Sequence, residues 1–242
     1  MADDGLAAPL GAGVLETELK LSATSAEPLR RLASMPRLGS IRLGEARTFL
    51  ELDRYLDTDD ARLSSSQWAC RLRRRSRRYL VSLKGPPAKS RAGAPCSREL
   101  GGVGPALHRR PEIEGPATAR LDPDSWPPSA ARSRLLSLAG GRDLHEVFAL
   151  RQRRTQRPVT ERRAQVATLS LDRVLVLHRG TTLGGLWCVE LELDAAAARR
   201  EERAQAALLA GLLTELLAVE GLSVEPLTKL ERAMTFLDHA AH

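Results

Sequence analysis

The stretch at 15–21 of this 242-residue chain reads Leu15-Glu16-Thr17-Glu18-Leu19-Lys20-Leu21. Charged and apolar side chains alternate in it, which is the pattern of a β-strand with one polar and one apolar face. Because side chains two positions apart lie on the same face of a strand, Glu16, Glu18 and Lys20 are expected together. The stretch 189–193 repeats the pattern with Glu190 and Glu192. Two distant strands therefore each carry a pair of carboxylates on one face.

Similar patterns predict further strands and a few helices. Strands are expected at 39–56, 69–75, 78–84, 108–115, 146–154, 160–172, 174–179 and 186–193, with 39–56 folded into a hairpin near Gly44–Glu45 and a tight turn at Ser76–Arg77. Helices are expected at 25–34, 129–139 and 196–220. Eight or more short strands in succession, with few helices between them, favour an antiparallel sheet or barrel flanked by helices. Residues 1–12 are expected to form a disordered tail, and the stretch 85–106, rich in Gly, Pro, Ala and Ser, a flexible loop.

Composition narrows the range of partners. Lys and Arg number 37 against 30 Asp and Glu, so the net charge of +7 calls for an anionic partner. Aromatic residues make up only 3% of the chain, which argues against a protein that binds single-stranded nucleic acid by stacking its bases. No apolar run approaches the roughly 18 residues of a membrane span, so no membrane partner is expected. Three scattered cysteines and an acidic N-terminal stretch without a leader pattern predict free thiols and a cytoplasmic location.

Charge pairs at alternate positions recur on several predicted strands. Arginines take these positions at Arg71, Arg73 and Arg75 and at Arg151 and Arg153, and Arg110 precedes Glu112 and Glu114 in the same spacing. A single strand of this kind usually turns its charges to water, but the repetition favours a shared charged interior. Carboxylates side by side repel one another unless a cation lies between them, and a divalent metal prefers such oxygen ligands. The arginine fork matches phosphate oxygens, so a closed barrel with both groups inside would bind metal and polyphosphate.

These motifs, in this order, resemble the CYTH family, the triphosphate tunnel metalloenzymes. The opening Glu16-Thr17-Glu18-Leu19-Lys20 is similar to the family's Glu-x-Glu-x-Lys strand. The later matches are Tyr55-Leu56-Asp57-Thr58-Asp59, Cys70-Arg71-Leu72-Arg73-Arg74, Leu83-Lys84-Gly85, Arg110-Pro111-Glu112-Ile113-Glu114, Leu150-Arg151-Gln152-Arg153-Arg154, Leu171-Asp172, Val189-Glu190-Leu191-Glu192-Leu193 and Thr228-Lys229-Leu230-Glu231-Arg232. Together they span residues 14–236.

The resemblance implies an α+β fold, in which a closed antiparallel barrel of eight strands with flanking helices encloses a charged tunnel over residues 13–238. It also implies a triphosphate substrate and Mg²⁺ or Mn²⁺ as cofactor. Carried over position by position, the metal ligands are Glu16, Glu18, Glu190 and Glu192, with Glu112, Glu114 and Asp172 as secondary candidates. The phosphate-binding residues are Lys20, Arg71, Arg73, Lys84, Arg151, Arg153 and Lys229, with Arg75 and Arg110 as possible additions. Glu18, Glu192 and Lys20 are the catalytic residues. The seven core cations and seven carboxylates cancel, so a tunnel that is neutral without metal is expected.

The implied reaction is hydrolysis of a small triphosphate, most simply inorganic triphosphate, by in-line attack of a metal-activated water. Class IV adenylate cyclase and thiamine triphosphatase are alternatives, because the family contains both activities. A non-catalytic module that binds polyphosphate or nucleotide is a further alternative, although a pure anion binder gains nothing from buried carboxylates. The shortage of aromatic residues leaves an RNA-binding role the weakest of the hypotheses.

Overall fold

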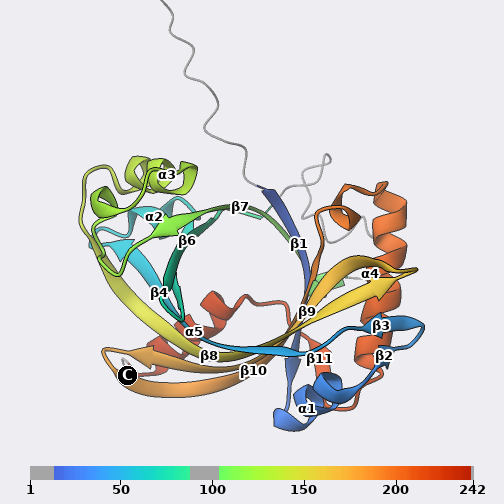
Figure 1. Ribbon diagram of the computed structural model, residues 1–242. Coiled ribbons are helices and arrows are strands. Elements are labelled where there is room, and N and C mark those ends of the chain that lie inside the picture. The colour runs from blue at the N-terminus through green and yellow to red at the C-terminus, as the bar shows by residue number, and fades with distance from the viewer. Residues whose placement is uncertain (1–13, 88–103, 241–242) are drawn as a thin grey trace, which may run out of the picture.

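Eight antiparallel strands close into a barrel in the computed structural model, which describes residues 14–87 and 104–240. Around the ring they follow the order β8 (Leu144–Glu161), β4 (Arg47–Thr58), β5 (Ala69–Arg75), β6 (Arg78–Lys84), β7 (Leu107–Ala117), β1 (Val14–Ala23), β10 (Thr181–Leu193) and β9 (Ala164–His178). Pairing of β9 with β8 closes the ring, which Figure 1 shows nearly end-on. The predicted α+β barrel with flanking helices is confirmed.

The hairpin predicted within 39–56 is wrong. Strands β3 (Ile41–Leu43) and β4 both pair with β8, so the chain continues along the same neighbour instead of reversing. The break between them lies at Gly44, where an added Cβ would come 3.1 Å from the Pro158 ring and where the backbone N–H donates to the Pro158 carbonyl at 2.8 Å. The actual hairpin joins β2 (Arg37–Leu38) to β3 through Gly39, whose φ of +56° suits a glycine.

Strands β8 and β9 are longer than the sequence pattern predicts. Their hairpin turns at Arg162 and Arg163, inside the predicted strand 160–172, and β9 then runs without a break through the position at 173. Both turn residues have positive φ, 45° and 74°, as a two-residue hairpin turn requires. Arginine carries no turn preference, so this turn had no signal in the sequence. The next hairpin turns at Arg179–Gly180, where glycine provides one.

Five α-helices flank the barrel in the described residues: α1 (Ala26–Ser34), α2 (Arg62–Ser65), α3 (Ala130–Ala139), α4 (Glu202–Leu217) and α5 (Lys229–Ala240). The helices predicted at 25–34 and 129–139 are confirmed, and in each the first residue of the predicted range, Ser25 or Ser129, caps the first turn with its hydroxyl. The helix predicted from residue 196 begins at Glu202, after a 3₁₀ turn at Ala197–Arg199. Helix α5 was not predicted. No helix in the described ranges combines the length and apolar content needed to cross a bilayer.

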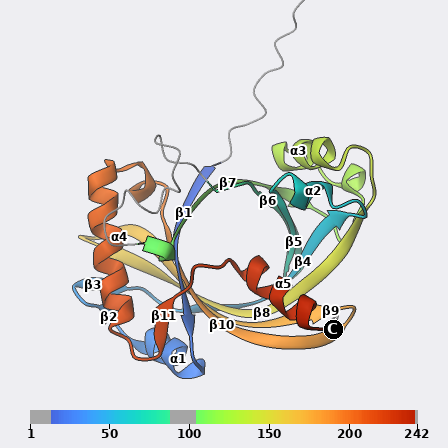
Figure 2. The same ribbon diagram turned by 180° about the vertical axis from the view of Figure 1, so that it is seen from behind.

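The apolar cores lie outside the barrel, between the strands and the helices. On one side, α1 and α4 cover β1, β9 and β10, and Leu19, Leu169, Leu191 and Leu209 are fully buried there. On the other side, α3 packs against the outer faces of β6 and β7, and its Leu135 is fully buried in a second apolar cluster. Because these strands turn their apolar faces outward, their polar faces point into the barrel. Helix α5 lies across one end of the ring, behind it in Figure 1 and in front of it in Figure 2.

Most of the two segments predicted to be disordered or flexible lies outside the described residues. The tail at 1–12 lies outside the described residues, and so do residues 88–103 of the loop predicted at 85–106. The last three residues of that loop, Gly104–Ala106, form a 3₁₀ turn that leads into β7. The short strand β11 (Leu222–Val224) pairs with β1 and brings the chain back to the barrel before α5.

Candidate functional site

A cavity of about 930 Å³ lies within the barrel. Among the described residues, ten Lys and Arg side chains and six Glu side chains line it. The lining therefore differs from the predicted set of seven cations and seven carboxylates, and it carries an excess of positive charge. Cations that the sequence analysis had left outside the core set, among them Arg77, Arg78 and Arg154, account for part of this excess.

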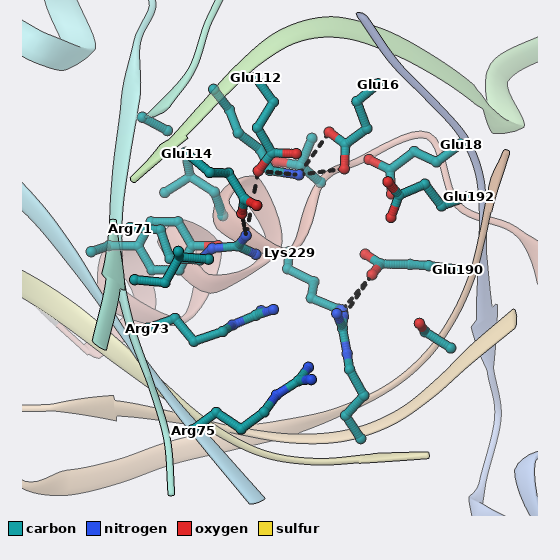
Figure 3. A pocket seen from close by; sticks show the side chains of 18 of the residues that line it. Glu16, Glu18, Arg71, Arg73, Arg75, Glu112, Glu114, Glu190, Glu192 and Lys229 are labelled. Atoms are coloured by element: carbon teal, nitrogen blue, oxygen red, sulfur yellow. Dashed lines mark hydrogen bonds and ion pairs between the residues drawn. The ribbon is translucent and has the colours of Figure 1, made fainter. Parts of the chain in front are cut away.

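One side of the cavity, the acidic wall, carries five carboxylates on three adjacent strands: Glu16 and Glu18 on β1, Glu112 and Glu114 on β7, and Glu192 on β10. Strand β1 lies between the other two, and its Glu18 faces Glu192 directly in the β1–β10 register. Figure 3 shows Glu16, Glu18 and Glu192 gathered on the same side of the cavity. The alternation read in 15–21 and 189–193 thus places these groups as expected.

Lysines hold part of the acidic wall. Lys84 donates to both carboxylate oxygens of Glu16, at 2.6 and 2.7 Å, and Lys20 donates to Glu18. Burial alone would raise the pKa of Glu18, but Lys20 and Lys84 outweigh it and lower that pKa to about 2. The side chain of Glu192 forms no hydrogen bond or ion pair with a described residue, and burial together with Glu16 and Glu18 raises its pKa to about 7. Burial and Glu18 also raise the pKa of Glu16.

These carboxylates fit a hard divalent cation by their chemistry, although not by their present geometry. Within 14–87 and 104–240, no three His, Cys, Asp or Glu side chains form a ready metal site. The oxygens of Glu16 and Glu18 are instead engaged by the flexible ammonium groups of Lys84 and Lys20. Burial, and after it repulsion between neighbouring carboxylates, raises the pKa values of Glu16 and Glu192, and a cation between the carboxylates would relieve that repulsion.

The opposite side, the basic wall, consists of Arg71, Arg73 and Arg75 on β5, Arg154 on β8 and Lys229 at the start of α5. The three β5 arginines share one face because they stand at alternate positions, as predicted. Figure 3 shows them in a row across the cavity from Glu16, Glu18 and Glu192. The cavity therefore presents carboxylates on one side and guanidinium groups on the other.

Two carboxylates, Asp172 and Glu190, bind the two cations of the basic wall that lie outside β5, Arg154 and Lys229. Arg154 donates to both oxygens of the fully buried Asp172, at 2.9 and 2.7 Å, and to Glu190 at 2.9 Å. Lys229 donates to the same two acids, at 2.5 and 2.8 Å. Burial opposes charge on Glu190, but Lys229, Lys20 and Arg154 hold its pKa well below the usual range. The predicted metal ligand Glu190 is thus surrounded by cations, and Asp172 orients Arg154 and Lys229 from behind the cavity surface.

Comparison with protein families assigns the chain. The family model of the CYTH domain matches residues 15–224. The chain belongs to the CYTH family. Members of this family include triphosphatases and cyclases, and they generally depend on a divalent metal. No curated protein matches the sequence as a relative.

Solved structures with the same fold include a Hippeastrum protein, HpAC1, described as an adenylyl cyclase candidate with a dominant triphosphatase activity. Its sequence is 18% identical, the match covers 91% of this chain and 95% of that one, and the TM-score is 0.59. A Bacillus halodurans protein described as a candidate adenylate cyclase is also 18% identical, with coverages of 92% and 98% and a TM-score of 0.54. The PH1819 protein from Pyrococcus horikoshii is 17% identical, with coverages of 90% and 98% and a TM-score of 0.51. At these identities the likeness is one of fold.

Two predicted phosphate ligands of this CYTH domain lie outside the tunnel. Arg151 and Arg153 point away from the cavity and are exposed, whereas their neighbours Gln152 and Arg154 are buried on the inner face of β8. Arginine occurs on both faces of this strand, as Arg151 and Arg153 on one and as Arg154 on the other. The two-residue alternation therefore could not show which face points into the barrel. The register between β8 and β9 shows that the face with Arg154 points inward, because Arg154 is directly opposite Asp172 in that pairing and binds it.

Several buried polar residues of the CYTH domain are not among those predicted from the sequence. Glu51, Asp53 and Gln152 lie behind the β5 arginines, and Tyr55 lines the cavity with its ring stacked on Phe148 at 4.6 Å. A signal for the β4 residues did exist. Glu51, Asp53 and Tyr55 alternate within one strand in the same way as Glu16, Glu18 and Lys20. The remaining predicted residues, Lys20, Lys84 and Arg110, all line the cavity.

Proposed function

We propose that this protein is a divalent-metal-dependent triphosphatase that hydrolyses a small triphosphate, most simply inorganic triphosphate. The observation that carries the proposal is the division of one cavity into an acidic wall and a basic wall that face each other. A triphosphate chain between the walls would contact guanidinium groups on one side, and a cation could neutralise its other side from the carboxylates.

The basic wall supplies the phosphate contacts in this proposal. Arg71, Arg73 and Arg75 follow one another along β5, so that successive phosphoryl groups can each meet a guanidinium. Arg154 and Lys229 face the same space from β8 and α5. Since hydrolysis spreads negative charge over the transferred phosphoryl group, fixed cations beside it stabilise the transition state more than the ground state.

Glu16, Glu18 and Glu192 would hold the divalent cation. Such an ion supplies charge neutralisation at the phosphoryl oxygens and activation of water. Release of Glu16 by Lys84 and of Glu18 by Lys20 frees those oxygens for the ion, and both lysines then remain beside the substrate as further cations. Glu190 stays with Lys229 and Arg154 in this assignment, since its contacts are already taken.

The chemical step is an in-line displacement. A water oxygen bonds to a terminal phosphorus, the bridging P–O bond on the opposite side breaks, and pyrophosphate leaves with orthophosphate as the other product. Glu192 has no bond to a described residue and can accept a hydrogen bond from the attacking water. Lys20, once it has released Glu18, can donate to the charge that develops on the transferred group. No covalent enzyme intermediate is needed.

An organic triphosphate is the second candidate, because one end of the cavity carries neutral side chains. Beside the β5–β6 turn the lining includes Tyr79, Leu80 and Pro116, together with Arg77 and Arg78. An uncharged group attached to a triphosphate could lie against these residues while its phosphates reach Arg73 and Arg71. These neutral side chains could contact the organic group of a thiamine or nucleoside triphosphate, a group that inorganic triphosphate lacks.

A phosphate-release assay tests both candidates. The protein is incubated with inorganic triphosphate, thiamine triphosphate or ATP, in Mg²⁺, Mn²⁺ or EDTA, and cyclic AMP is measured in parallel. Turnover of inorganic triphosphate that stops in EDTA supports the proposal, and faster turnover of an organic substrate moves it to the second candidate. Binding without turnover in either metal, or formation of cyclic AMP, would overturn it.

A further inference from the structure

Two carboxylates lie behind the basic wall, where they contact no solvent-filled space of the cavity. Glu51 and Asp53 stand two positions apart on β4, and their exposed fractions are only 3% and 1%. In the β4–β5 pairing, Glu51 is opposite Arg75 and Asp53 is opposite Arg73. Neither acid lines the cavity, so neither can contact a substrate in it.

Each acid holds one arginine of the basic wall. Asp53 accepts two hydrogen bonds from Arg73, from Nε and Nη2, both at 2.7 Å. Glu51 accepts from Arg75 Nε at 2.6 Å and lies 3.4 Å from Arg73 Nη2. A planar guanidinium bound along one edge keeps its remaining N–H groups in a fixed direction. Since Arg73 and Arg75 both line the cavity, their unbound edges are the ones that face it.

An amide ties the two acids together. Gln152 Nε2 donates to Glu51 Oε2 at 3.0 Å and to Asp53 Oδ2 at 2.8 Å, from the neighbouring strand β8. Two buried carboxylates this close repel each other, and a neutral donor shared between them fixes their separation without adding charge. Burial opposes charge on Asp53, but Arg73 outweighs it and holds the pKa at about 2, so the acid stays ionised.

Arg71, the third β5 arginine, is held differently. Its Nη1 lies 3.9 Å from Asp53, and its Nη2 contacts Ser82 at 3.3 Å and Glu112 at 3.4 Å. Its Nε has no hydrogen-bond partner among the described residues. Among the three β5 arginines, only Arg73 is bound edge-on to both oxygens of one carboxylate; Arg71 has no such contact.

We propose that Glu51, Asp53 and Gln152 form a positioning layer that orients Arg73 and Arg75 toward the phosphoryl groups of the substrate. The inference rests on the proposed function, because it assumes that the cavity binds a triphosphate. A site built only to attract anions would lack this layer, since each buried carboxylate reduces the positive potential of the wall. What the layer contributes is preorganisation: the side-chain freedom of two arginines is already lost before the substrate arrives.

The variant Asp53→Asn separates positioning from charge, because the two give opposite signs. Removing one negative charge behind the wall strengthens anion binding if only net charge matters. If Asp53 positions Arg73, the same change weakens anion binding. The affinity for triphosphate should then fall about tenfold or more, as expected for the loss of a charge-assisted pair. The measurement is calorimetric titration of inorganic triphosphate into the full chain in EDTA, which requires no turnover. Weaker binding is the expected result, and equal or tighter binding by the variant overturns the inference.

Three further variants complete the test. Glu146→Gln removes an ion pair between Glu146 and Arg54 that also joins β8 to β4 but does not line the cavity, so it should bind as the wild type does. Glu51→Gln releases Arg75 by the same logic and serves if Asp53→Asn fails to fold. Arg73→Lys should weaken binding, and Asp53→Asn should then add little more, because the two residues act as one unit. Additive losses in this cycle contradict the positioning role.

The outcomes also distinguish this inference from the proposed function. If the wild type binds no triphosphate, the proposed function fails, whatever the variants do. If the wild type binds it and Asp53→Asn binds at least as well, only the positioning layer is refuted.

Discussion

The two walls of the cavity hold their charged groups in different ways. On the acidic wall, Glu16 and Glu18 are engaged by lysines, whose ammonium groups end flexible chains, and Glu192 has no bond to a described residue. On the basic wall, Arg73 and Arg154 are each bound edge-on by a buried aspartate. A lysine contact is easily exchanged for a cation, whereas a two-bond arginine pair resists exchange. The difference indicates that one wall is suited to receive an ion and the other to keep its shape.

The largest effect is expected from the acidic wall. Glu192→Gln or Glu18→Gln removes a charge that the cation requires, so metal-dependent phosphate release should fall on the order of 100-fold or more. The thermal midpoint of Glu192→Gln should stay close to that of the wild type, because the Glu192 side chain forms no hydrogen bond or ion pair with a described residue. Initial rates in Mg²⁺ and a thermal melt measure the two quantities. Wild-type rates in both variants would remove these residues from the metal site.

On the basic wall, Arg73→Ala should cost roughly 10- to 100-fold in kcat/KM, since it deletes one oriented guanidinium and leaves Asp53 buried without its partner. The loss should appear in KM more than in kcat if Arg73 binds the substrate and the transition state alike. Initial rates over a range of triphosphate concentrations give both constants. If neither constant changes, Arg73 is not a phosphate ligand.

A smaller effect is expected in the acid stability of the basic wall. The pKa of Asp53 is about 2 in the folded protein, below its ordinary value of 3.8, so its ionised form stabilises the fold above about pH 4. That contribution, on the order of 2 kcal/mol, is lost as the pH falls from 4 toward 2. Urea unfolding of wild type and Asp53→Asn at pH 6 and pH 2.5 measures it. The gap in unfolding free energy should shrink at the lower pH, and a constant gap would contradict the assignment.

The smallest effect is expected on the outer face of β8. Arg151→Ala and Arg153→Ala change exposed side chains that do not line the cavity, so KM and kcat should stay within about twofold and the unfolding free energy within about 0.5 kcal/mol. Arg154→Ala, one position along, should be severely impaired, because Arg154 binds Asp172 and Glu190 inside. Initial rates and urea unfolding measure these quantities. A large loss of kcat/KM in Arg151→Ala would show that the outer face of β8 contributes to activity.

Much of the fold could be predicted from the sequence. Strands β5 and β6 and the turn between them match their predicted positions, because alternation on both sides of a short polar turn leaves a single register. The walls on β1, β7 and β10 follow from the same alternation. The hairpin at Gly44 failed for a different reason. A break in a pattern shows that a strand is interrupted, but not whether the chain then reverses or stays with the same neighbour.

What the sequence determined by itself is which side chains share a face within each strand, because the two-residue period is a local property of the backbone. Only the tertiary structure decided which face of β8 lies inside, that Glu190 belongs with Lys229 and Arg154, and that Glu51 and Asp53 stand behind the β5 arginines. These outcomes depend on the register between strands that are far apart in the chain, such as Gln152 beside Glu51. Register is set by the closure of the whole barrel, and no single strand contains that information.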